Sequence, residues 1–239
     1  MNKSLSLFTT LGLFASSQAA TLTWSDDPFT DSAQVNNIGT TLYAHNMGSV
    51  ATINVNGVDF TGQTAASIAS VTNLRWGTSD AATANAGGLY GGALGVSGLS
   101  ASDETTLLDN IVYGNNQGAG FQFEGLTIGE AYVAQFIVVD NRGGFTGRSM
   151  HFSQDGSTWA GALVDYTSNP SAPGPNNWAR VVTTSFVADS TTQTFRFGIQ
   201  GIGSPEASAM QLRQIPEPST TVLFVLGSLG LCGRRRRLS

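Results

Sequence analysis

Apolar and polar residues alternate with a period of two over much of the chain between residues 21 and 214. Successive side chains of a β-strand point to opposite faces of its sheet, so this alternation predicts strands that bury one face. The clearest examples are Thr194–Ile199, with three apolar residues on one face, and Trp178–Val187. Ala207–Gln214 has the pattern of a closing strand. We therefore expect the middle of the chain to be rich in β-structure.

Two further segments indicate a central strand and a hairpin. Ala131–Asp140 is the most apolar of the strand-like segments, and we expect it inside a sheet. Ala51–Phe60 contains two short strand-like runs separated by Asn56-Gly57. Because a two-residue type I′ turn needs positive φ at both central residues, an Asn-Gly pair here predicts a β-hairpin.

One segment has helical rather than strand periodicity. Ser102 can cap it, and Asp103 and Glu104 favour the positive end of a helix. Its apolar residues form one stripe, followed by a glycine that can end the helix: Leu107, Leu108, Ile111, Val112 and Gly114. The pattern predicts a helix over Asp103–Tyr113. Strands at irregular spacing with one short helix predict an all-β fold, a jelly-roll-like β-sandwich.

The first 20 residues have the features of a secretory signal peptide. Lys3 supplies a positive start, and Leu5–Ala15 is an apolar run too short to span a bilayer. Ser17-Gln18-Ala19 provides small residues at a cleavage site, so we expect cleavage after Ala19 or Ala20. Residues 1–20 would then form a signal helix that directs the chain to the Sec translocon and is removed by signal peptidase. A buried N-terminal helix is the alternative.

The C-terminal segment, residues 215–239, combines three features in order. A proline–glutamate–proline motif is followed by an apolar segment at 219–233 and a basic end; the residues are Pro216, Glu217 and Pro218, then Arg234, Arg235, Arg236 and Arg237. A helix of the apolar segment would be about 22 Å long, shorter than the ~30 Å hydrocarbon core of a bilayer. Its glycines weaken it further. We expect a transient membrane stop with cytoplasmic arginines; a permanent anchor is the alternative.

This ordered tail resembles the PEP-CTERM sorting signal. The resemblance implies recognition by an exosortase-type membrane protease, which would cleave near Pro216-Glu217-Pro218 and transfer the protein to the cell surface or the extracellular matrix. It also implies an association with exopolysaccharide. The expected course is export, transient anchoring in the inner membrane by a hydrophobic helix, and release to the surface, with the folded domain at residues 21–214.

Charge and cysteine content exclude several classes of protein. The chain has 16 acidic and 11 basic residues, but between Thr21 and Gln214 there are fifteen acidic residues and six arginines, a formal charge near −9. Such a domain should repel nucleic acid, which binds basic surfaces. The single cysteine, Cys232, lies in the apolar tail, so the domain lacks disulfides and thiol nucleophiles. No HExxH, GxSxG or nucleotide-binding motif occurs, and we predict no catalytic residue.

Candidate ligand-binding residues in the domain are aromatic or charged. Trp76 and Trp159 are candidates for stacking on sugar rings, with packing at the edge of the core as the alternative. Asp140, Arg142 and Arg148 follow the apolar central strand. They could hold a polar ligand or form a structural salt bridge.

Asp26, Asp27 and Asp31 carry enough oxygen atoms for a calcium site, or form an acidic loop without metal. No other cofactor is expected. The turn at Gly125–Tyr132 resembles the edge of galactose-binding-like sandwich modules. Three classes of function remain: a non-enzymatic surface or matrix protein, which we favour, a carbohydrate-binding module, and a secreted glycan-active enzyme. An exposed aromatic strip would favour the second class, and two convergent carboxylates in a cleft would favour the third.

Overall fold

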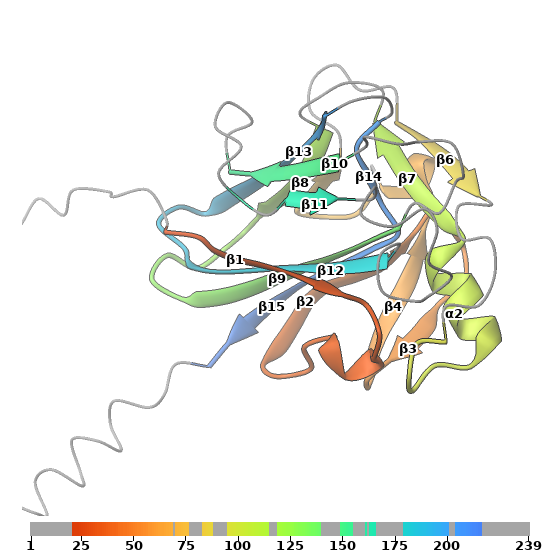
Figure 1. Ribbon diagram of the computed structural model, residues 1–239. Helices are drawn as coiled ribbons and strands as arrows, with labels where there is room; N and C mark the ends of the chain where they lie inside the picture. Colours follow the sequence, from red (N-terminus) through yellow and green to blue (C-terminus); the bar gives the residue numbers. More distant parts are fainter. Residues whose placement is uncertain are drawn as a thin grey trace, which may run out of the picture.

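Strands dominate the computed structural model (Figure 1). It describes residues 21–68, 70–76, 83–87, 95–114, 119–139, 149–154, 161, 163–165, 179–200 and 204–216. These residues form an all-β sandwich, as the alternating sequence predicts. The two terminal helices expected from the sequence lie outside the described residues.

Three sheets make up the described part of the fold. The first has seven strands in the order β1 (Thr23–Pro28), β12 (Ala179–Val187), β9 (Ala131–Val139), β15 (Ala209–Ile215), β2 (Thr40–Met47), β4 (Val58–Gln63) and β3 (Ile53–Val55). The second has the order β11 (Leu163–Asp165), β10 (Ser149–Ser153), β13 (Thr192–Gln200), β8 (Ala119–Glu124) and β5 (Leu74–Trp76). The third is β14 (Glu206–Ala207), β7 (Asn110–Gly114) and β6 (Thr83–Gly87).

From β8 onward the chain alternates between the two larger sheets. It passes from β8 in the second sheet to β9 in the first, returns through β10 and β11, and repeats this crossing with β12 and β13 before ending in β15. Apart from β10 and β11, which pair with each other, strands that follow one another in this stretch therefore lie in different sheets instead of pairing in hairpins. This connectivity is typical of jelly-roll sandwiches.

The main core lies between the two larger sheets and is built from phenylalanine rings. Phe195 and Phe197 of β13 point into it, as their shared strand face predicts, and both are fully buried. Phe197 contacts Phe152 of β10 and Phe136 of β9, with ring centroids 4.6 and 5.0 Å apart. Burial of each such ring contributes about 1.5–3 kcal/mol to folding. This layer fixes how the two sheets face one another.

The first sheet is also covered on its other face, and this explains the sequence of β9. A second buried cluster there includes Ile137 and Val139 of β9, together with the β3–β4 hairpin and α2 (Ala101–Leu108). Phe136 and Val138, on the opposite face of the same strand, belong to the core between the sheets. Because β9 is buried on both faces, its residues are nearly all apolar instead of alternating. The prediction of a central strand here is confirmed.

The hairpin predicted at Asn56-Gly57 joins β3 to β4. Asn56 has φ of 50° and Gly57 has φ of 79°, as a type I′ turn requires. The side-chain oxygen of Asn54 accepts a hydrogen bond from the Gly57 amide at 3.1 Å. The predicted hairpin at Asn56-Gly57 is confirmed.

The predicted helix over Asp103–Tyr113 is wrong in its second half. Helix α2 ends at Leu108, and its cap is Ser100 instead of Ser102, with Ser100 Oγ accepting a hydrogen bond from the Asp103 amide at 3.2 Å. The segment from Asn110 onward is strand β7. Pairs of apolar residues spaced by four fit a helical stripe and also a strand buried on both faces, so periodicity could not decide between them.

Two short helical elements complete the described fold. They are the 3-10 helix η1 (Ser32–Gln34) and helix α1 (Ala65–Ile68). Among the described residues, no helix is both long and apolar enough to cross a membrane.

Candidate functional site

The C-terminal strand β15 leads directly into the sequence motif at Pro216. It is an interior strand, paired with β9 on one side and with β2 on the other. Its last residues are still within these ladders: Ile215 pairs with Ala131 of β9, and Gln214 pairs with Thr40 of β2. Pro216 follows at once and is exposed. No linker separates the folded sheet from the motif.

Arg213 ties the end of β15 to residues 37–41, which form the turn before β2 and the start of that strand. Its side chain is 5% exposed. Nε donates to the carbonyl oxygen of Ile38 at 2.8 Å, and Nη2 donates to those of Asn37 at 2.9 Å and Gly39 at 2.6 Å. Nη1 donates to Thr41 Oγ1. All these acceptors are neutral, and burial lowers the pKa of the guanidinium below its ordinary value.

Two glutamines continue this polar layer on the same face of the sheet. Gln211 Nε2 donates to Gln135 Oε1 at 2.6 Å and to the carbonyl of Asn36 at 3.0 Å. Gln135 Oε1 also accepts from the Asn36 amide at 2.7 Å, and Gln135 Nε2 donates to the carbonyl of Gln34 at 2.9 Å. The segment 34–41 is therefore tied to β9 and β15 by three buried side chains. The end of β15, from which the C-terminal tail leaves, is therefore fixed by side-chain hydrogen bonds to β9 and to the segment 34–41.

A glycine allows the close approach of this segment. Gly39 has φ of +82°, and a Cβ at this position would collide with the carbonyl oxygen of Gln214. Gln214 also donates through Nε2 to Glu130 Oε2 at 3.2 Å. The last two residues before the motif thus have fixed neighbours in the turn before β2 and in the turn before β9.

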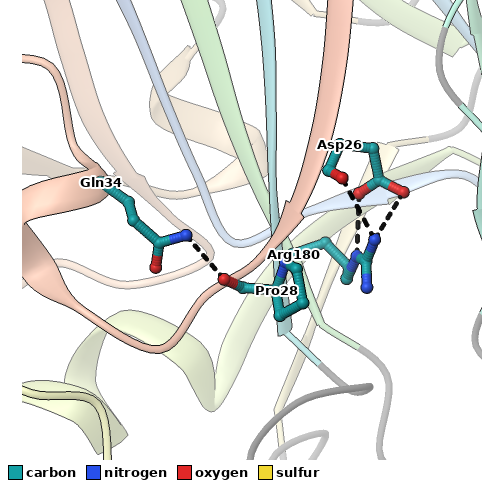
Figure 2. Close-up of polar contacts among 4 residues, drawn as sticks. All are labelled: Asp26, Pro28, Gln34 and Arg180. Atoms are coloured by element: carbon teal, nitrogen blue, oxygen red, sulfur yellow. Dashed lines mark hydrogen bonds and ion pairs between the residues drawn. The ribbon is translucent and has the colours of Figure 1, made fainter.

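The three aspartates considered for calcium have separate roles in the structure. Asp26 lies on β1 and binds Arg180 of β12, with Nε to Oδ1 at 2.8 Å and Nη2 to Oδ2 at 2.9 Å (Figure 2). Asp27 is exposed on the opposite face of β1. Asp31 caps η1 by accepting a hydrogen bond from the Ala33 amide at 2.8 Å. Asp26 and Asp27 are thus strand residues, not members of an acidic loop.

Gln34 completes this cap from the other end of η1. Its Oε1 accepts from the amides of Thr30 and Asp31 at 2.8 and 2.9 Å. Its Nε2 donates to the carbonyl of Pro28 at 2.7 Å (Figure 2). Within the ranges that the structure describes, no group of three histidine, cysteine, aspartate or glutamate side chains could hold a metal ion. A calcium ion at Asp26, Asp27 and Asp31 stays a prediction that this geometry does not favour.

The predicted sugar-stacking tryptophans and the predicted polar-ligand residues stay predictions. Trp159, Asp140, Arg142 and Arg148 lie outside the described residues, as does the side chain of Trp76 at the end of β5. The basic end and Glu217 and Pro218 of the motif also lie outside them.

Sequence reasoning did not single out His45, which is 9% exposed on β2. Burial lowers the pKa of this histidine below its ordinary value, and a contact with the Thr61 backbone opposes the shift in part. The neighbouring Tyr43 has a raised pKa, because it is partly buried and lies near Glu124. Tyr43, His45 and Met47 alternate with other residues along β2 and so share one face of the strand. This alternation is the sequence signal that could have predicted a buried His45.

Comparisons with known proteins identify the tail. Residues 214–237 match the family model of the PEP-CTERM protein-sorting motif. No curated protein matches the chain in sequence. A β-glucuronidase of Bacteroides uniformis is similar over 73% of this chain and 18% of its own, at 14% identity and a TM-score of 0.41. A structure of carbohydrate-binding modules from the β-sandwich superfamily is similar over 79% of this chain and all of its own, at 10% identity and a TM-score of 0.17.

The fold and the tail together define an all-β sandwich protein with a C-terminal sorting motif. The chain is an exported protein, and its PEP-CTERM motif indicates a C-terminal membrane-anchor region. The resemblance seen in residues 216–237 is thereby confirmed.

Proposed function

We propose that this chain is a non-catalytic cell-surface or matrix protein that an exosortase-type enzyme cleaves near Pro216-Glu217-Pro218. The Sec translocon and signal peptidase handle its N-terminus. The apolar segment at 219–233 and the four terminal arginines hold the chain transiently in the inner membrane. The match of residues 214–237 to the PEP-CTERM protein-sorting motif is the observation that carries this proposal.

The position of β15 supports removal of the tail. Described strand structure ends at Ile215, one residue before the motif. Cleavage after Pro216 would leave both ladders of β15 and the Arg213 contacts intact. The sandwich therefore loses none of its described structure when the tail is removed, as expected for a sorting signal appended to a finished domain.

A non-catalytic role is consistent with the contacts of the acidic side chains. Asp26 is paired with Arg180, and Glu124 with Arg75 at 2.6 Å. Buried Glu104 accepts hydrogen bonds from the amides of Gly95 and Val96 at 3.1 and 3.0 Å. These carboxylates have structural partners. Exopolysaccharide is the proposed neighbour of the mature protein, as the sorting-signal resemblance implies.

The test is the intact mass of the surface protein from a host with the cognate exosortase. We expect the wild-type mass to exclude Val222–Ser239. Glu217→Ala should block processing, so that the uncut precursor accumulates in the inner membrane. Asp27→Ala, which removes an exposed carboxylate on β1, should be processed normally. A mature wild-type protein that still contains Val222–Ser239 would show that the tail is an ordinary anchor.

A second change tests the membrane stop separately from cleavage. Replacement of Arg234–Arg237 with serine should impair retention before cleavage, because translocation of four arginines across a bilayer is costly. The measurement is the fraction of uncut chain found in the periplasm or the medium. Complete retention of the serine variant would contradict the stop function of the arginines.

A further inference from the structure

We infer that the end of the sandwich around Ile215 is a lipid-contacting surface, pressed against the outer face of the inner membrane while the precursor is anchored. This inference rests on the proposed membrane stop. We call this surface the exit pole and define it by Ile38, Leu42, Ile128 and Val187.

These four residues surround the point at which the chain leaves the sheet. Ala131 of β9 pairs with Ile215 on one side and with Val187 on the other. Ile128 lies in the turn three residues before Ala131. On the opposite side of β15, the Ile38 carbonyl is bound by Arg213.

Leu42 reaches the exit pole through an irregularity in β2. The β2–β15 pairing passes from Tyr43 opposite Leu212 to Thr41 opposite Arg213. Leu42 is the extra residue of this bulge, and it is 39% exposed. Bulges often redirect a side chain toward a functional surface. We therefore count the outward-facing Leu42 as part of the exit pole.

Exposed large apolar residues are concentrated at this pole. In the described part of the chain they are Ile38 at 65%, Leu42 at 39%, Val50 at 86%, Ile128 at 61% and Val187 at 53% exposure. Four of the five therefore lie around Ile215. Val50 lies at the other end of the first sheet, where Gly62 of β4 approaches its backbone.

The length of the tail brings this surface to the bilayer. Three residues, Pro216–Pro218, and hence four peptide links separate Ile215 from Ser219, the first residue of the apolar segment. Even a fully extended chain of that length spans only about 14 Å. The headgroup region of each leaflet is about 5–8 Å thick. While the segment is inserted, the end of β15 can therefore lie no more than about 6–9 Å above the headgroups, and a link that is not fully extended brings the exit pole onto them.

The N-terminus leaves from the same side. Thr23, the first residue of β1, pairs with Ser185 of β12, two residues from Val187. Figure 1 shows β1 beginning and β15 ending on one side of the molecule. Both segments that contact the membrane during export are therefore attached at this pole.

Charge indicates which lipids the pole tolerates. Glu130 and Asp189 lie beside Ile128 and Val187, since the Ala188 amide donates to the Glu130 carbonyl at 2.9 Å. These carboxylates are repelled by anionic headgroups. Contact therefore comes from apolar side chains held close by the tail, and it should be closer on zwitterionic than on anionic bilayers.

The test uses the full-length precursor in phosphatidylcholine vesicles, without exosortase. In a Cys232→Ala background, single variants Ile128→Cys, Val187→Cys and Val50→Cys carry an environment-sensitive fluorophore. Doxyl groups near the lipid headgroups should quench the labels at 128 and 187 at least about twofold more than the label at 50. Vesicles with phosphatidylglycerol should reduce that difference.

A linker variant tests whether the tail holds the pole in place. An insertion of about 30 Gly and Ser residues between Ile215 and Pro216 adds roughly 30 Å of reach, and it should bring quenching at 128 and 187 down to that at 50. Unchanged quenching in this variant would overturn the role of the short tail.

Flotation with the vesicles separates the two proposals. Precursor that does not float overturns the membrane stop and the exit pole together. Precursor that floats with equal, weak quenching at all three positions overturns the exit pole alone. Labels that become shielded only when an exosortase is added would also overturn it, because the pole would then contact protein instead of lipid.

Discussion

Arg180 of β12 clamps the carboxylate of Asp26 on β1 with two parallel hydrogen bonds, from Nε at 2.8 Å and from Nη2 at 2.9 Å (Figure 2). The Asp26 and Arg180 side chains are only 16% and 18% exposed. β1 is an edge strand of the seven-stranded sheet, and this pair adds to its ladder with β12. The pair therefore secures the first strand that follows the predicted signal peptide.

Asp26→Asn should destabilise the exported protein by about 2 kcal/mol, because it weakens two charge-assisted hydrogen bonds and leaves Arg180 without its counter-charge. Asp27→Asn on the exposed face of the same strand should change the free energy of unfolding by less than about 0.5 kcal/mol. Urea unfolding of both variants measures the difference. Equal stabilities would show that the pair contributes nothing.

Gly39→Ala and Gly57→Ala form a matched pair. Both glycines have nearly the same φ, +82° and +79°, but a Cβ at Gly57 has no heavy atom within 4 Å, whereas one at Gly39 collides with the Gln214 carbonyl. Gly57→Ala should cost about 1–2 kcal/mol from its left-handed backbone alone. Gly39→Ala should cost clearly more, and hydrogen exchange should speed up at the end of β15. Equal costs would contradict the close approach.

Arg213→Met should lower the free energy of unfolding by roughly 2–4 kcal/mol, because it removes the buried guanidinium that donates to the part-buried carbonyl oxygens of residues 37–39. Arg75→Met is the control, since that side chain is 68% exposed and its ion pair with Glu124 is solvated. Its loss should cost less than about 1 kcal/mol. A loss after Arg213→Met that is no larger than this would show that water replaces the guanidinium at no cost.

His45 should make stability depend on pH. Its folded-state pKa lies below the ordinary value of 6.5, so between the two values only the unfolded chain takes up the proton. The contribution of neutral His45 is then complete above about pH 6.5 and is lost as the pH falls below it. The difference in unfolding free energy between wild type and His45→Gln, measured from pH 7.5 to 5, isolates this group from the carboxylates. A difference that does not change with pH would contradict it.

The strands and the hairpin could be predicted because their information is local. Phe195 and Phe197 show their face by alternation, and Asn56-Gly57 needs no distant partner to form its turn. The boundary between α2 and β7 could not be predicted, because Ile111 and Val112 suit a helical stripe and a strand buried on both faces equally.

The layer that holds the base of the tail depends on contacts between distant parts of the chain. Arg213 binds the carbonyls of Asn37 and Ile38 across 175 or more positions, and Gln211 is 76 positions from Gln135. A single sequence shows Arg213 and Gln211 only as polar interruptions in an apolar strand. By contrast, the sorting motif could be predicted because its three parts are adjacent in sequence, and each is recognisable by its own composition.

The interior position of β15 sets the order in which an exported chain can fold. In the proposed export through the Sec translocon the N-terminus emerges first, so β9 and β2 would reach the far side of the membrane long before the strand that lies between them. The seven-stranded sheet stays open until the last strand has crossed the membrane. The next residues are the motif and the apolar segment at 219–233. Pairing of β15 between β9 and β2 would therefore coincide with arrival of the motif at the membrane surface. Under the proposed function, an exosortase-type enzyme at that surface would therefore meet its cleavage site only when the last strand is available to complete the sheet.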